Sequence, residues 1–102
     1  SMKVQMNAVH FTADKKLLDF IQQRLNKLET FYDKVTGGEV TLRVNNKDGV
    51  SNKTVEIKLL VPGGTLFSEE DAVSFEAATD AATENLRRQI VKHKEKTLVK
   101  AH

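Results

Sequence analysis

The sequence predicts an α+β fold, a β-α-β-β-β-α two-layer sandwich whose four-stranded sheet carries two helices packed on one face. Two long segments repeat apolar residues at spacings of three and four, as helices do, and shorter segments alternate polar and apolar residues, as strands do. The first helix can form a right-handed crossover between parallel strands, whereas short loops make the later strands antiparallel. The 102-residue chain fits one domain, expected over residues 2–102.

The first strand and the first helix are expected near the beginning of the chain. Residues 3–9 alternate between polar and apolar types, which indicates a half-buried strand. A helix is expected over residues 13–32, with Thr12 before it and Asp14 in its first turn. Its apolar stripe consists of Leu17, Leu18, Ile21, Leu25, Leu28 and Tyr32.

Three further strands are expected between the two helical segments. Gly37 and Gly38 end the first connection as a turn, and an alternating strand follows until the turn-forming residues 45–49. The third strand alternates over residues 54–61 and ends at the Pro62-Gly63-Gly64 turn. The fourth strand starts at residues 65–68. The apolar residues that alternate with other residues in the second and third strands are Val40, Leu42, Val44, Val55, Ile57, Leu59 and Val61.

A second helix is expected over residues 75–96. Either Ser68 or Ser74 could cap its N-terminus, and the apolar periodicity favours Ser74. Its buried stripe contains Phe75, Ala78, Ala82, Leu86 and Ile90. Residues 97–102 are expected to form a flexible tail, and Ser1, which precedes Met2, is interpreted as a cloning remnant.

Composition and motifs argue against several classes of protein. No apolar run approaches the roughly 18 residues of a membrane span, and no leader is recognised, so a cytoplasmic location is expected. The chain has no cysteine, and its three histidines (His10, His93 and His102) are too dispersed for a metal site. Neither a nucleophile motif nor a phosphate-binding glycine loop is present, and the acids at 69–71 and 76 are explained by the helix dipole. We therefore expect no enzymatic activity, no cofactor and no metal.

Charge is strongly segregated along the chain. Residues 66–84 contain six acids and no base, whereas residues 85–102 contain six bases and one acid, a net charge of +5. Steps of about 100° per residue place Arg88 and Lys92 on one flank of the second helix, and Arg87 and Lys94 on the other. The corresponding cations of the first helix are Lys16, Arg24, Lys27 and Lys34.

If the two helices pack side by side, these flanks can merge into a basic surface that follows a phosphate backbone. The helix dipole explains one or two cations at a helix C-terminus, but hardly six. The basic segment contains no aromatic residue, so contacts to the backbone of a folded RNA are favoured over base stacking.

Three segments resemble the ribosome hibernation-promoting factors, also called the ribosome-associated inhibitor A or protein Y family. They are residues 24–29 (RLNKLE), 61–64 (VPGG) and 86–96 (LRRQIVKHKEK), the last being the most specific. The resemblance extends from Met2 to Lys96 and includes the expected element order. Because the sequence ends soon after the second helix, the resemblance is to the short form of the family, and the C-terminal domain through which longer members dimerise is not expected.

The resemblance implies a translation inhibitor that docks on the small ribosomal subunit, in the messenger channel where transfer RNAs would also sit, and preserves idle ribosomes under stress. It also implies ribosomal RNA contacts by basic residues at the matching positions, which are Arg24, Lys27, Arg88, Lys92, Lys94 and Lys96. Arg87 replaces what is often an acid and should strengthen this surface. Ser74, Thr79 and Thr83 depart from the residues that are usual in the family. These departures bear on how tightly the second helix packs. A monomer off the ribosome is expected, because no strand presents a bare apolar edge.

Two other functions are possible for a chain with this pattern. A double-stranded-RNA-binding domain has a similar core but carries lysines at the start of its last helix, where this chain has acids. A protein–protein adaptor would use the outer face of the sheet, but that face has no recognisable aromatic anchor. The adaptor residues expected there are Arg43, Glu56, Lys58 and Leu60.

Overall fold

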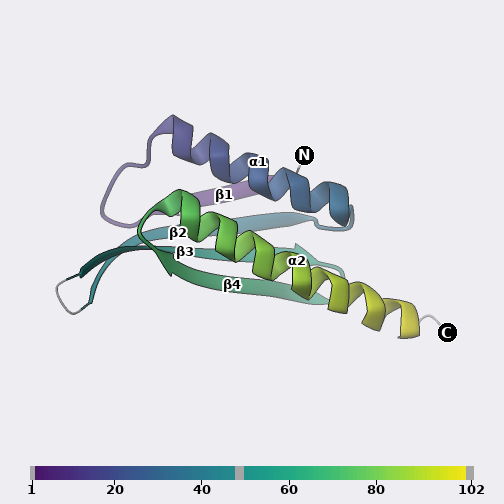
Figure 1. Ribbon diagram of the computed structural model, residues 1–102. Coiled ribbons are helices and arrows are strands. Elements are labelled where there is room, and N and C mark those ends of the chain that lie inside the picture. The colour runs from purple at the N-terminus through teal and green to yellow at the C-terminus, as the bar shows by residue number, and fades with distance from the viewer. Residues whose placement is uncertain (1, 48–49, 101–102) are drawn as a thin grey trace.

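The computed structural model describes residues 2–47 and 50–100 and confirms the predicted fold class. Figure 1 shows two helices on the same side of one sheet, both running in the same direction. The elements in chain order are β1 (Lys3–Ala8), α1 (Lys15–Phe31), β2 (Gly37–Lys47), β3 (Val50–Val61), β4 (Gly64–Ala72) and α2 (Phe75–Lys100).

The sheet has the strand order β1-β2-β3-β4. β1 pairs with β2 in parallel, so α1 forms the expected crossover connection. The β2–β3 and β3–β4 pairs are antiparallel hairpins, also as predicted. In this register Met6 lies beside Val40, and Val40 lies beside Ile57, which aligns the apolar side chains on one face.

β2, β3 and β4 are longer than predicted, β1 ends one residue earlier, and two predicted turns are placed differently. β2 continues through Lys47, so residues 45–47 of the expected turn belong to this strand, and residues 48–49 lie outside the described residues. Gly37 and Gly38 belong to β2 instead of forming a turn. A Cβ atom at Gly38 would lie 3.3 Å from Leu59 Cδ2, so close packing, and not turn formation, explains this glycine. Gly63, with φ of 83°, does occupy the predicted turn.

The helix boundaries are set by two capping side chains. Asp14 is the N-cap of α1, not a first-turn residue, because its carboxylate accepts a hydrogen bond of 2.9 Å from the Leu17 amide. Ser74 caps α2 as predicted, since its hydroxyl accepts a hydrogen bond of 3.1 Å from the Ala77 amide. α2 continues to Lys100, so the predicted tail over 97–102 begins inside this helix, and residues 101–102 lie outside the described part.

The acidic segment is divided between two elements. Glu69, Glu70 and Asp71 lie in β4, where they pair with β3, and only Glu76 lies in the first turn of α2. The interpretation of residues 69–71 as dipole-compensating acids was therefore wrong. Glu76 is therefore the one acid in the first turn of α2, where a double-stranded-RNA-binding domain would carry lysines.

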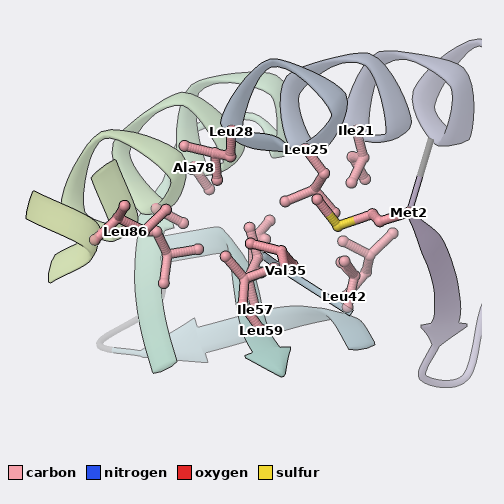
Figure 2. Close-up of a cluster of buried hydrophobic side chains, with 14 of the residues drawn as sticks. Met2, Ile21, Leu25, Leu28, Val35, Leu42, Ile57, Leu59, Ala78 and Leu86 are labelled. Atoms are coloured by element: carbon pink, nitrogen blue, oxygen red, sulfur yellow. The ribbon is translucent and has the colours of Figure 1, made fainter. Parts of the chain in front are cut away.

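The core lies between the sheet and the two helices, as Figure 2 shows. Leu25 of α1 and Leu86 of α2 are fully buried against Ile57 and Leu59 of the central strand β3. Thr79 and Thr83 are also buried, and the Thr83 hydroxyl donates to the Thr79 carbonyl at 2.9 Å. No helix in the described part of the chain is both long enough and apolar enough to span a bilayer.

Candidate nucleic-acid interface

One flank of α1 combines cations with aromatic rings. Phe20, Arg24, Lys27 and Phe31 follow one another at spacings of four, three and four, so they lie on the same side of the helix. The Arg24 guanidinium lies 4.7 Å from the centroid of the Phe20 ring, a cation–π contact. This flank faces α2, because Arg24 Nε also lies 3.1 Å from the Asp80 carboxylate of that helix.

The two helices enclose a surface hollow of about 650 Å³. Its charged lining contains three of the predicted site residues and two acids: Arg24, Lys27, Arg87, Asp80 and Glu84. Leu28, Thr30, Phe31 and Thr83 complete the lining. The lining therefore carries both signs of charge, with the cations in excess.

The acids of α2 hold arginine side chains beside the hollow. Arg87 Nη2 donates to Glu84 Oε1 at 2.7 Å, and Arg88 Nη1 lies 3.6 Å from the same oxygen. The hydrogen bond from Arg87, together with the charges of both arginines, lowers the pKa of the Glu84 carboxyl. All three side chains are about half exposed, so water screens these pairs and they add little stability. Their effect is to orient the guanidinium groups.

Lys94 connects the end of α2 to the end of α1. Its Nζ lies 5.0 Å from the centroid of the Phe31 ring, 5.9 Å from that of Tyr32, and 3.5 Å from the Phe31 carbonyl oxygen. The same ammonium thus places a positive charge over an aromatic ring that lines the hollow.

The remaining predicted cations, Arg88, Lys92 and Lys96, are exposed on the other side of α2. Helical steps of about 100° place Lys92 and Lys96 on the side of Gln89, whose amide nitrogen donates to the Phe67 carbonyl of β4 at 2.7 Å. Among the described side chains, no carboxylate lies within 4.0 Å of the ammonium groups of Lys92 and Lys96.

The structure thus brings the predicted site residues together in two groups. The groove group consists of Arg24, Lys27, Arg87 and Lys94, and the outer group consists of Arg88, Lys92 and Lys96. Lys34, assigned to the flank of the first helix, lies in a turn after α1 ends. Sequence reasoning missed Phe20 and Phe31 because it searched for aromatic residues only within the basic segment. The helical spacing from Phe20 to Phe31 was the signal that could have found them.

The outer face of the sheet has a different character. Arg43 bridges Glu56 at 2.8 Å and Glu69 at 3.8 Å, so most of its charge is balanced within the sheet. Phe67 is 50% exposed and Leu60 is 43% exposed, so the prediction that this face has no aromatic anchor was wrong. Within residues 2–47 and 50–100, no group of three or more histidine and acidic side chains is arranged to hold a metal ion.

Comparison with known proteins places residues 4–98 in the family model described as Sigma 54 modulation protein / S30EA ribosomal protein. The chain is 32% identical over 95 residues to a ribosome hibernation promoting factor of Pseudomonas putida, covering 93% of this chain and 89% of that protein. It is 30% identical to a ribosome hibernation promotion factor of Deinococcus radiodurans, covering 88% of this chain and 48% of that longer protein.

Two solved structures have the same fold. A ribosomal subunit interface protein from Coxiella burnetii matches with a TM-score of 0.83 and 18% identity, covering 92% of this chain and 99% of that one. The N-terminal domain of Protein Y from Thermus thermophilus matches with a TM-score of 0.71 and 20% identity, covering 90% of this chain and 99% of that one.

Proposed function

Because this chain belongs to the Sigma 54 modulation protein / S30EA ribosomal protein family, we propose that it is a ribosome hibernation factor that inhibits translation by binding the small ribosomal subunit. The relatives named ribosome hibernation promoting factor support the ribosome-associated role. A ribosome partner also supports a cytoplasmic location. The proposed mechanism is occupation of the messenger and transfer RNA sites, without any chemical step, so the chain acts as a binding protein and not as an enzyme.

The arrangement of cations along the two helices is the main support for this proposal. The groove group and the outer group put seven cations on α1 and α2, the side of the molecule opposite the outer face of the sheet. Glu84 and Asp80 balance part of this charge, but Lys27, Lys92, Lys94 and Lys96 have no carboxylate within 4.0 Å among the described side chains. Such a surface suits the closely spaced phosphates of a folded RNA.

Inhibition of a cell-free translation reaction tests the proposed function. Adding the protein at about the concentration of the ribosomes should stop most synthesis, because each small subunit that binds it can no longer hold messenger and transfer RNA. Adding it after synthesis has begun should inhibit less, because the sites are then occupied. Undiminished synthesis with the protein in several-fold excess over ribosomes would contradict the proposal.

We also propose that the protein is a monomer off the ribosome. At one edge of the sheet, Gln89 of α2 donates a hydrogen bond to the Phe67 carbonyl of β4, which partly covers that edge. Light scattering should therefore give a mass near 11.4 kDa over a dilution series, and a mass of twice that value at every dilution would contradict it.

A further inference from the structure

We propose that the hollow between α1 and α2 is a binding site for one unpaired nucleotide, whose base stacks on Phe31. The inference rests on the proposed function for the presence of RNA, and it goes further by specifying a single-stranded partner at this position. It differs from the expectation from the sequence, which favoured backbone contacts to a folded RNA over base stacking.

The position of Phe31 suits stacking with a base. The side chain lies at the last residue of α1, is 40% exposed, and lines the hollow instead of packing in the core. An exposed aromatic ring loses contact with water when a base stacks on it, and such stacking contributes substantially to single-strand binding. The Lys94 ammonium lies 5.0 Å from the ring centroid and so places a positive charge beside the ring.

The mixed charges of the lining suit a base better than a phosphate. A site for phosphate alone would be purely basic, but this hollow contains the Asp80 and Glu84 carboxylates as well as the cations. Both carboxylates are paired with arginines of the same lining, Asp80 with Arg24 and Glu84 with Arg87. Their remaining lone pairs can accept hydrogen bonds from the amino groups of bases, so the mixed lining suits a base inside. Lys27 is exposed and, among the described side chains, has no carboxylate partner, so it is available to the phosphate of the same nucleotide.

The size and shape of the hollow suit a single unpaired base. The volume of about 650 Å³ falls within the range of about 300–1,000 Å³ that is usual for small-molecule sites. The bases of duplex RNA are already stacked on one another and cannot reach such a hollow, whereas an unpaired base can turn into it. The site should therefore distinguish single-stranded from double-stranded RNA.

Tryptophan fluorescence gives a direct test, because the native chain contains no tryptophan. Phe31→Trp places the only tryptophan at the site, and Phe67→Trp is the matched control, because Phe67 is similarly exposed on the opposite face of the sheet. Each variant is titrated at low salt with a labelled single-stranded RNA of about ten nucleotides and with the duplex of the same sequence. Anisotropy of the label measures binding independently of quenching.

We expect the single strand to quench the Phe31→Trp variant and the duplex to leave it nearly unchanged, with no quenching of the Phe67→Trp variant by either RNA. Phe31→Ala should weaken single-strand binding about tenfold and leave duplex binding unaltered. Equal quenching by both RNAs, binding without quenching, or no single-strand binding at all would each overturn the inference. Co-sedimentation of the native chain with small subunits separates the two proposals, because it can succeed when the nucleotide site fails.

Discussion

Replacing Arg88 and Lys92 together by glutamate is expected to weaken binding to the small ribosomal subunit on the order of a hundredfold or more. Both side chains are exposed on the outer side of α2, so the change removes two phosphate contacts and adds two repulsions. Neither residue belongs to the buried stripe, so the fold should remain intact. The double variant should consequently no longer inhibit cell-free translation at concentrations at which the native chain does.

A matched control separates this effect from a general loss of positive charge. Lys3→Glu with Lys58→Glu changes the net charge equally, but both lysines are exposed at the outer face of the sheet. The control should bind within a few-fold of the native chain, with circular dichroism confirming that both variants are folded. Undiminished inhibition by the Arg88/Lys92 variant would show that these cations are only the solvated end of a helix. An equal loss in the control would show that net charge, and not this position, determines binding.

Binding to the small subunit should also depend steeply on salt. Four cations have no carboxylate partner among the described side chains, and the paired arginines contribute in part, so about five phosphates should be neutralised. The log–log slope should then be roughly −4, and raising the salt from about 50 to 200 mM should weaken binding on the order of a hundredfold. A slope near zero would indicate an interface built from uncharged contacts.

The same titration with the Arg88/Lys92 variant checks whether these residues act through phosphates. Loss of two ion pairs should reduce the slope by roughly two. Replacing Glu69 and Glu70 by glutamine should leave both the slope and the affinity nearly unchanged, because these residues lie in β4 and not at the start of α2.

The fold was predictable because local patterns and long-range packing agree in most elements. The alternation from Val55 to Val61 and the stripe from Ala78 to Ile90 are visible in the sequence because a strand or helix that buries one face needs apolar residues at those spacings. The errors occurred where pairing overrides local preference. Glu69 to Asp71 form a strand because β3 supplies partners for their backbone, although acidic residues are uncommon in strands.

The candidate site was predictable in its charges but not in its shape. Counting cations along the helical wheel identified Arg24, Lys27 and Arg87, which do line one hollow. The depth of the hollow depends on the distance between the two packed helices. The residue pattern within a single helix does not determine that distance. The mixed charge depends likewise on contacts across the gap, such as that between Arg24 and Asp80.

Co-sedimentation with purified ribosomal subunits through a sucrose gradient at low salt tests whether the protein binds the small subunit. We expect the protein to migrate with the small subunit and not with the large one, because only the small subunit is proposed to present the RNA surface that the α1 and α2 cations match. Equal migration with both subunits, or with neither, would contradict it.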